Sequence, residues 1–245
     1  MEKISDYTGY DYKTKFWTKN REYEHIVDLE TINSCLNKYK IGSDKILDAG
    51  CGFGRLLPAY IDHFKEYTLF DYAHTLLNQA KETYKNLESV RYVQGNLYEL
   101  PFLDKEFDSA ISIRTLHHIN NLELFIKNIH RCLNSKGLFI FDVPNKIHLK
   151  NRLKHLVTRE PHDLYSLDKL IYMETYVNHH PKTVEQVLET QGFEILEILN
   201  TNLLRLNFLK KLIPTQYLIK LDKWTQCFVK KYYWSPSLYY ITIKK

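Results

Sequence analysis

Residues 46–54 join a short apolar run to a turn with glycine at every second position, Gly50, Gly52 and Gly54. Glycine lets the backbone approach a ligand closely where any Cβ would clash. A second apolar run follows and ends at an acid, Asp71. Strand, glycine turn, helix, strand and acid is the layout of βαβ units that bind nucleosides, where the acid meets the ribose hydroxyls. The sequence therefore predicts an α/β fold with a nucleoside site at this turn.

The spacing of these glycines argues against a dinucleotide site. The dinucleotide fingerprint G-x-G-x-x-G requires its third glycine at the position that Arg55 occupies, whereas this chain reads D-x-G-x-G-x-G from Asp48. A glycine-rich turn without a ligand is the alternative interpretation. Because three glycines in five residues weaken a fold unless a ligand needs close approach of the backbone, the pattern favours a bound nucleoside.

Length and composition fit one domain with a substantial core, since the chain has 245 residues and 44% of them are apolar. The sequence contains no run of about 18 apolar residues and no apolar region of a secretion signal at its start. Its four cysteines are far apart and form no C-x-x-C pair. We therefore expect a cytoplasmic protein whose thiols form neither disulfides nor a zinc site.

Positive charge is concentrated near the C-terminus. Residues 202–245 hold nine lysines or arginines against one acid, Asp222, which gives this segment +8 in a chain of net charge +5. The stretch from Lys146 to Arg159 holds five more basic residues and no acid. Such asymmetry indicates an anionic partner near these segments, and a solvated basic surface is the equally favoured alternative.

Hydrophobic periodicity predicts a regular alternation of strands and helices. Strands are expected at 45–49, 67–71, 90–94, 107–113, 138–143, 193–200 and 238–243. Helices are expected at about 19–39, 54–64, 73–86, 121–133 with Asn121 as its cap, and 183–192, where 183–186 form a capping box. Two more are expected within 145–176, and one or two basic helices within 203–233, broken at Pro214. This alternation predicts a parallel sheet with right-handed crossovers and helices on both faces.

Five parts of the chain carry a family pattern: residues 48–54, Asp71, 95–102, 107–119 and 131–140. Together they resemble the class I S-adenosylmethionine (SAM) dependent methyltransferases, and most closely the branch with ubiquinone/menaquinone and natural-product small-molecule enzymes. The resemblance implies SAM as cofactor and S-adenosylhomocysteine as product. It also implies a Rossmann-like, doubly wound α/β fold, with a mostly parallel seven-stranded sheet, helices on both faces and helical additions near both termini.

The same resemblance implies which residues bind the cofactor. The glycine turn and Asp48 would line the methionine half of SAM, and Asp71 would hold the ribose hydroxyls, with a turn-forming role as the alternative. Asn96 stands where relatives commonly have Asp, and its carbonyl oxygen can still accept a hydrogen bond from the adenine amino group. The full set is Tyr12, Phe16, Asp48, Gly50, Cys51, Gly52, Gly54, Arg55, Asp71, Tyr72, Asn96, Leu97 and Arg114.

The pair His117 and His118 is the strongest candidate for chemistry. It follows the fourth strand, at the edge where ligands lie in open α/β sheets, and a histidine there could take a proton from an acceptor hydroxyl or amine. A structural histidine bonded to the backbone is the alternative. Asp142 could orient such a base or cap the loop that follows. Methyl transfer is an in-line displacement from an activated sulfonium, so positioning is the main contribution of the protein, and we expect no metal.

We interpret the chain as one methyltransferase domain, residues 1–245. Residues 1–40 would form an aromatic, helical lid, 41–145 the SAM-binding core, and 146–180 with 202–236 helical additions on the acceptor side. The alternative for the N-terminal aromatic residues is that they pack the first helix onto the sheet. The favoured acceptor is an O or N atom of a small molecule, with an acidic or phosphorylated one as an option. RNA, a lipid or quinone met at a membrane surface, and SAM binding without catalysis are the alternatives, because the C-terminal segment mixes basic and aromatic residues.

Overall fold

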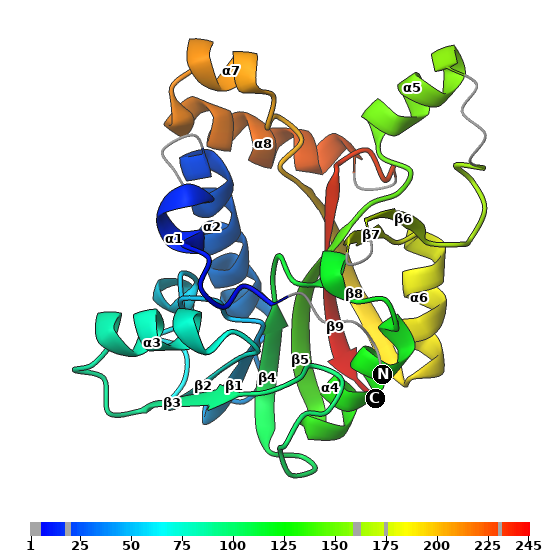
Figure 1. Ribbon diagram of the computed structural model, residues 1–245. Coiled ribbons are helices and arrows are strands. Elements are labelled where there is room, and N and C mark those ends of the chain that lie inside the picture. Colours follow the sequence, from blue (N-terminus) through cyan, green and yellow to red (C-terminus); the bar gives the residue numbers. More distant parts are fainter. Residues whose placement is uncertain (1–5, 18–20, 159–162, 174–175, 230–231) are drawn as a thin grey trace.

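A seven-stranded sheet runs through the centre of the protein (Figure 1). The computed structural model describes residues 6–17, 21–158, 163–173, 176–229 and 232–245. The strands are β1 (Lys45–Ala49), β2 (Glu66–Asp71), β3 (Val90–Gln94), β4 (Phe107–Ser112), β5 (Leu133–Pro144), β8 (Phe193–Thr201) and β9 (Ser237–Lys244). Strands β1 to β5 pair in parallel, and β9 pairs antiparallel with both β5 and β8. The predicted doubly wound, mostly parallel sheet is confirmed.

The strand order, β3-β2-β1-β4-β5-β9-β8, reverses direction between β1 and β4. The chain builds outward from β1 through β2 and β3 on one side, and through β4 and β5 on the other. At such a reversal the loops after the two central strands diverge, which opens a crevice beyond their carboxyl ends. The turn after β1 and the loop after β4 flank this crevice, so the sheet topology fixes where a ligand can lie.

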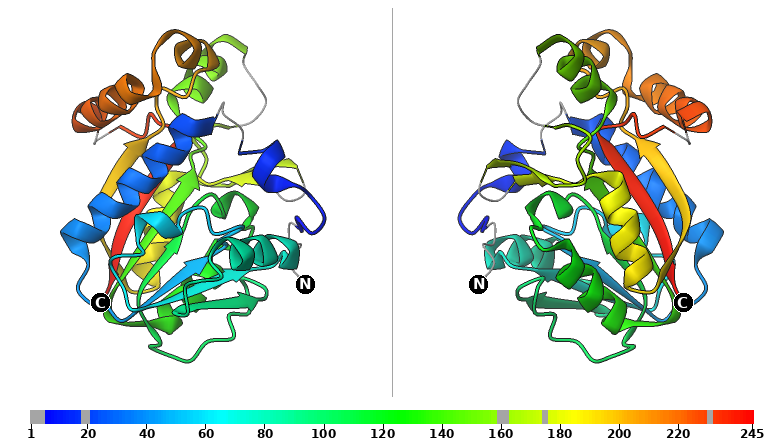
Figure 2. Two further views of the ribbon diagram at one scale, coloured as in Figure 1. Left: turned by 90° about the vertical axis from the view of Figure 1, so that its left-hand side faces the viewer. Right: turned by 90° about the vertical axis from the view of Figure 1, so that its right-hand side faces the viewer.

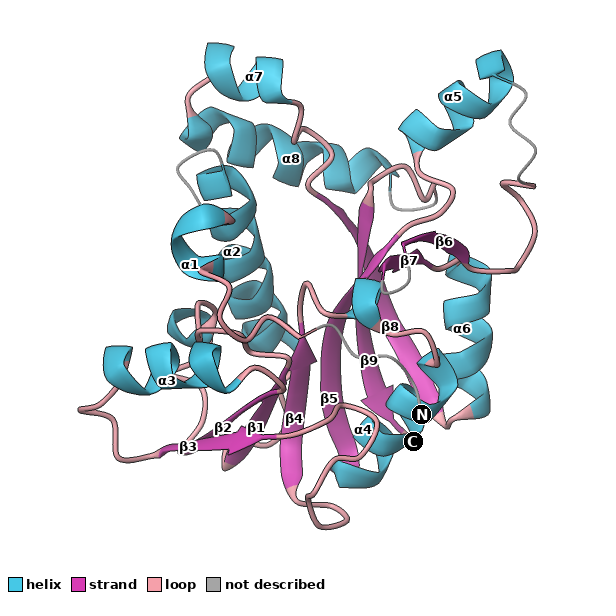
Figure 3. Cartoon of the chain, viewed as in Figure 1, coloured by secondary structure: helices cyan, strands magenta, loops and turns pink. Residues whose placement is uncertain are grey.

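Helices cover both faces of the sheet (Figures 2 and 3). Helices α4 (Leu122–Cys132) and α6 (Pro181–Thr190) pack on one face, and α2 (Glu22–Tyr39) and α3 (His74–Thr83) on the other. Each set encloses its own buried apolar layer. The sheet is therefore shielded from water on both sides, as parallel strands require.

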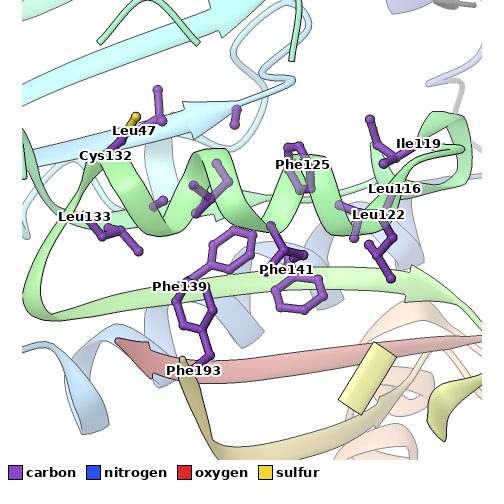
Figure 4. Packing of buried hydrophobic residues seen from close by; sticks show 14 of the residues in the cluster. Leu47, Leu116, Ile119, Leu122, Phe125, Cys132, Leu133, Phe139, Phe141 and Phe193 are labelled. Atoms are coloured by element: carbon purple, nitrogen blue, oxygen red, sulfur yellow. The ribbon is translucent and has the colours of Figure 1, made fainter. Parts of the chain in front are cut away.

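Phenylalanine side chains fill the layer between α4 and the sheet (Figure 4). Phe125 of α4 meets Phe139 of β5, whose ring stacks on Phe141 with centres 4.5 Å apart. All three are fully buried, and burial of each such side chain contributes roughly 1.5–3 kcal/mol. Leu116 and Ile119 belong to the same cluster and anchor the short 3₁₀ helix η3 (Leu116–His118) that precedes α4. Core packing thus holds the histidine pair at the crevice.

The strand predictions are confirmed to within a few residues, but the helix predicted over 54–64 is wrong. That segment forms turns around a 3₁₀ helix, η2 (Leu57–Ala59), in which Ala59 N–H donates to Leu56 O and Tyr60 N–H to Leu57 O. Pro58 lacks the N–H that an α-helix over 54–64 would need to bond Gly54 O, and most of the hydrogen bonds around η2 join residues three apart.

Two expectations for the later third are also corrected. Helix α5 (Leu149–Thr158) is present, but in place of a second helix the described residues form a two-stranded sheet of β6 (Leu170–Met173) and β7 (Tyr176–Asn178). Ile171 and Tyr172 of β6 are residue types that favour strands. Residues 159–162 and 174–175 lie outside the described ranges. The capping box at 183–186 is wrong, because α6 begins at Pro181 and the side chain of His180 caps it by accepting from Lys182 N–H.

Three further helices are α1 (Tyr12–Lys15), α7 (Asn207–Leu212) and α8 (Thr215–Val229). Pro214 separates α7 from α8, as predicted. Helix α8 packs on α2 through Leu218 and Ile219, which are buried against Val27. None of the helices within the described ranges has the length and apolar character needed to cross a membrane.

The N-cap of α4 can be tested by mutation. Asn121 Oδ1 accepts a hydrogen bond from Leu124 N–H, 3.1 Å away, as the sequence predicted. Replacement by alanine leaves that N–H unpaired, so Asn121→Ala is expected to lower the free energy of unfolding by about 1 kcal/mol in urea titrations. Asn121→Asp keeps the acceptor and should change stability by less than half as much. Equal losses in both variants would contradict the cap.

Candidate functional site

The turn after β1 is folded tightly against the loop after β4. Gly50 has φ +85°, and a Cβ there would lie 2.4 Å from Thr115 Oγ1. Gly52 has φ +56°, and its missing side chain faces open space, with Leu76 the nearest neighbour at 4.0 Å. Both residues adopt backbone conformations that side chains disfavour. Gly50 is therefore required by packing, whereas Gly52 keeps a cradle open at the crevice.

The carboxylate of Asp71 closes this turn from the end of β2. Its oxygens accept from Gly52 N–H at 2.7 Å and from Ala73 N–H at 2.9 Å. Burial raises the pKa of Asp71 above its ordinary value, while the backbone N–H donors oppose that rise. The acid predicted from sequence thus lies directly across from the glycine turn, locked in one orientation.

A first cavity lies over this turn, at the carboxyl ends of β1, β2 and β4. Most of the residues predicted to bind the cofactor lie on its wall. They are Tyr12, Gly50, Cys51, Gly52, Arg55, Asp71, Tyr72, Asn96, Leu97 and Arg114, and His118 joins them. Asn96 Oδ1 accepts from Tyr98 N–H, 2.9 Å away, so this side chain also shapes the loop after β3. The structure brings these residues together although they span most of the predicted core.

Three residues of the predicted set do not lie on this cavity. Asp48 is buried beneath the turn, where it accepts from Tyr60 Oη at 2.7 Å, and burial raises the pKa of its carboxyl to about 7. Gly54 has φ +74° and a Cβ there would meet the Tyr84 ring at 3.0 Å, so its role is packing against α3. Phe16 faces a second cavity.

The second cavity, of about 1090 Å³, adjoins the first. Tyr7, Tyr12 and Arg114 line both, so the two spaces meet at these side chains. Its remaining lining comes from distant parts of the chain. It includes Lys15, Phe16, Trp17, Arg21, Glu22, Glu24, His117, Asp142, His148, Tyr176, Arg205, Lys210 and Lys211.

The two candidate histidines face different spaces. His118 lies on the first cavity and its Nε2 is 2.8 Å from Tyr7 Oη. His117 lies on the second, with its ring centre 3.9 Å from that of His118. Burial, together with His118 and Arg114, holds the pKa of His117 well below its usual range, which keeps its ring in the neutral form.

Asp142 does not orient either histidine. Its oxygens accept from Arg114 N–H at 2.5 Å and from Ser237 Oγ at 2.6 Å, and lie 3.5 Å from the Arg114 guanidinium. Arg114 has φ +59°, a conformation that costs a non-glycine residue of order 1–3 kcal/mol. The position of Asp142 is thus explained by support of Arg114 rather than by proton transfer.

A buried carboxylate that sequence reasoning missed organises the wall of the site. Asp28, from α2, is fully buried and pairs with Arg55 at 2.8 Å and with Arg114 at 2.9 Å. Tyr239 of β9 is the third partner of Asp28 and donates a hydrogen bond 2.6 Å long to it. Burial alone would raise the pKa of Asp28, but the two guanidinium groups outweigh it and hold the pKa below its ordinary value.

Other wall residues were missed, most of them because they are apolar or lie outside the family motifs. Thr115 is the exception, a polar residue within the motif 107–119. Tyr7, Phe53, Leu76, Thr115 and Ile119 line the first cavity and Arg205 the second. The aromatic run at the start of the chain was the one signal that could have identified Tyr7. Asp28 stands in an amphipathic helix, where an acid normally indicates the solvent face.

Comparison with known proteins identifies the family of the segment that contains the glycine turn. The family described as "Methyltransferase domain" matches residues 47–141. The uncharacterized protein MJ1252 of Methanocaldococcus jannaschii is 30% identical over 217 residues, 82% of this chain and 81% of that protein. The ubiquinone/menaquinone biosynthesis C-methyltransferase UbiE of Shewanella pealeana is 25% identical over 179 residues, 64% of this chain and 68% of that enzyme.

Solved structures extend the likeness of fold to nearly the whole chain. The SAM-dependent methyltransferase from Mesorhizobium loti superposes with a TM-score of 0.62 and 17% identity, covering 91% of this chain and 100% of that one. Coverage of the curated relatives is less even. This chain spans 63% of the uncharacterized protein MJ0638 of M. jannaschii and 42% of the fatty-acid O-methyltransferase of Mycolicibacterium smegmatis.

Removal of the Asp28 charge tests the buried cluster. Asp28→Asn leaves two buried guanidinium groups without their common carboxylate, so a loss of about 3–5 kcal/mol in the free energy of unfolding is expected. Because the pKa of Asp28 is lowered in the folded state, its stabilisation is complete above about pH 4 and is lost as pH falls through the folded value. The difference between wild type and variant should therefore shrink in acid.

Asp104→Asn provides the matched control for this cluster. Asp104 also pairs with an arginine, Arg131, at 2.8 Å, but its side chain is exposed to solvent. Its loss should cost less than about 1 kcal/mol. Similar costs for the two substitutions in urea titrations at pH 7 would contradict the organising role of Asp28.

Proposed function

This chain belongs to the class I SAM-dependent methyltransferases, and we propose that it methylates an O or N atom of a small anionic molecule held in the second cavity. One observation carries the proposal: a cradle suited to SAM and a larger, cationic space meet at Tyr7, Tyr12 and Arg114. Methyl transfer needs donor and acceptor side by side in line, and two adjoining cavities provide that arrangement.

The walls of the first cavity fit SAM. Gly52 leaves space for close approach of a ligand, and the Asp71 carboxylate, already held by two N–H donors, suits ribose hydroxyls at the end of β2. Tyr72, Asn96 and Leu97 stand on the side where the adenine would lie. Bound SAM supplies a methyl group already activated by the sulfonium, so the residues of this chain need only bind, align and exclude water.

Charge on the second cavity supports an anionic acceptor. Its lining includes Lys15, Arg21, Arg114, Arg205, Lys210 and Lys211 against Glu22, Glu24 and Asp142. Asp142 pairs with Arg114, and Glu24 pairs with Lys210. The balance leaves an excess of positive charge on walls that come from the N-terminal segment and from residues 205–211. A carboxylate or phosphate in this space would therefore be attracted.

His117 is the better placed of the two histidines to act as general base. It faces the second cavity, whereas His118 faces the first and lies within hydrogen-bonding distance of Tyr7. A neutral imidazole there can take the proton that an acceptor hydroxyl or ammonium must lose. We include His117 in the proposal as that base and His118 as a residue that positions Tyr7.

We also propose that the N-terminal segment acts as a lid. Tyr7 and Tyr12 lie on both cavities, and Gly9 N–H donates to Thr75 Oγ1 of α3 at 3.3 Å. The Arg55 guanidinium lies 3.8 Å from the centre of the Trp17 ring, which ties the end of the segment to the glycine turn. Segments 146–180 and 202–236 would complete the acceptor side, through residues such as His148 and Arg205.

Loss of the ribose-binding carboxylate tests the cofactor site. Asp71→Ala removes the acceptor proposed for the ribose hydroxyls, and hydrogen bonds to charged groups contribute about 1.5–3 kcal/mol, so SAM affinity should fall by roughly 10- to 150-fold in calorimetric titrations. Asp44→Ala, at an exposed carboxylate beside β1, should leave affinity unchanged. The melting temperature without ligand shows whether each variant folds. Unchanged affinity in Asp71→Ala would refute the assignment.

Labelled SAM tests the acceptor. The protein is incubated with methyl-labelled SAM and a cell extract separated into anionic metabolites, neutral metabolites, lipid and RNA. Label is expected in the anionic metabolites, and Arg205→Gln should raise KM for that acceptor by at least about tenfold. Arg91→Gln, which removes an arginine far from both cavities, is the control. Label in RNA or neutral metabolites alone would contradict the proposal.

A further inference from the structure

Helix α5 carries an apolar stripe that nothing in the described structure covers. Leu149, Leu153, Leu156 and Val157 recur at i, i+4, i+7 and i+8, the spacing of one helical face. All four are exposed, Leu156 by 76% and Val157 by 83%, and α5 has no buried residue. In water such a face has no stabilising role, so its presence calls for an occupant.

Helix α8 also carries exposed apolar side chains. Leu218 and Ile219 pack inward on α2, while Tyr217, Leu221 and Trp224, at i, i+4 and i+7, form a second stripe. That stripe lies on a different face of the helix and is exposed, Trp224 by 62%. Leu206 and Leu212, at the two ends of α7, are exposed beside it. One helix thus serves both the core and a second apolar surface.

These helices project from the same end of the molecule. Figure 1 shows α5 and the pair α7 and α8 above the carboxyl ends of the parallel strands, and both views of Figure 2 keep them there. The second cavity draws its lining from this end: His148 directly precedes α5, Arg205 precedes α7, and Lys211 lies on α7. We refer to the exposed residues of α5, α7 and α8 as the apical surface.

The charges of the apical surface have one sign. Helix α5 contains Lys150, Arg152 and Lys154 and no acid. The single acid of α7 and α8, Asp222, is buried and accepts from Asn202 N–H and Leu203 N–H, at 3.2 and 3.0 Å. Lys211 and Lys220 are exposed. Apolar stripes flanked by lysines, without exposed acids on the same helices, are complementary to an anionic bilayer.

We propose that the apical surface docks the protein on anionic membranes, with Leu153, Leu156 and Val157 of α5 and the exposed stripe of α8 entering the headgroup region. The basic residues would lie at phosphate level, and the second cavity would open toward the bilayer. The proposal does not depend on the acceptor, because docking requires neither SAM nor methyl transfer.

Vesicle sedimentation without SAM tests this surface. Unilamellar vesicles of phosphatidylglycerol should pellet the wild-type protein at low salt, whereas phosphatidylcholine vesicles should not. Lys150→Gln with Lys154→Gln should weaken binding by about fivefold for each lysine. Leu153→Gln, Leu156→Gln and Val157→Gln together should weaken it by at least about tenfold. Because none of these residues is buried, circular dichroism should show unchanged folding.

The chain offers matched controls at the other end of the sheet. Leu103 precedes β4 and is 77% exposed, so Leu103→Gln removes an equally exposed leucine far from the apical surface. Lys81→Gln with Lys127→Gln removes two exposed lysines of α3 and α4. Neither control should change vesicle binding.

Three results would overturn the docking proposal: no binding to phosphatidylglycerol vesicles, equal loss in the Leu103 control, or binding unaffected by the α5 substitutions. If those substitutions instead abolish self-association in analytical ultracentrifugation and vesicles do not bind, the surface is an interface between copies of this chain. Failure of docking would leave SAM binding intact, so it is distinguishable from failure of the proposed function.

Discussion

The site depends on one buried carboxylate. Asp28, on α2, holds Arg55 of the glycine turn, Arg114 of the loop after β4, and Tyr239 of β9. Four elements that are distant in sequence are therefore tied at a single charge. Taking that charge out of water is costly, and only the two guanidinium groups and the hydroxyl offset the cost. The geometry of the cavity wall therefore depends on Asp28 being ionised.

Arg114 links this buried carboxylate to the two cavities, because it pairs with Asp28 and lines both. Its left-handed backbone is held by Asp142, and its side chain by Asp28, so the residue between the two cavities has little freedom. For an in-line displacement the protein must fix the direction of approach, and a rigid side chain between the two cavities suits that requirement. The neutral His117 lies on the second cavity, which Arg114 also lines.

The segments outside the core differ in how firmly they are packed. Helices α4 and α6 bury whole faces against the sheet, whereas α5 buries no residue and α8 buries one face while exposing another. Apolar surface that stays in water forfeits roughly 25 cal/mol for each Å² left exposed. The exposed leucines of α5 gain none of this burial energy within the described structure. This is why we propose that a membrane covers them.

Local patterns and motif spacing in the amino-acid sequence were enough to predict the seven strands of the central sheet, the glycine turn and the methyltransferase family. They also placed Asp71 at the end of the second strand. Sequence also indicated Asn121 as a cap and Pro214 as a break, because these effects act over a few residues. It misjudged 54–64, where Pro58 altered the hydrogen-bond pattern, and 183–186, where His180 and Pro181 start the helix earlier.

Only the tertiary structure decided which residues share a wall. Asp48 and Gly54 belong to the motif yet pack beneath the turn, and Asp142 supports Arg114 rather than a histidine. Asp28 carries no local signal, because a helical acid acquires a buried partner only when distant elements close over it. Contacts among residues 28, 55, 114 and 239 form only when distant parts of the chain pack together, and no short-range pattern encodes them. This is why the sequence did not identify Asp28.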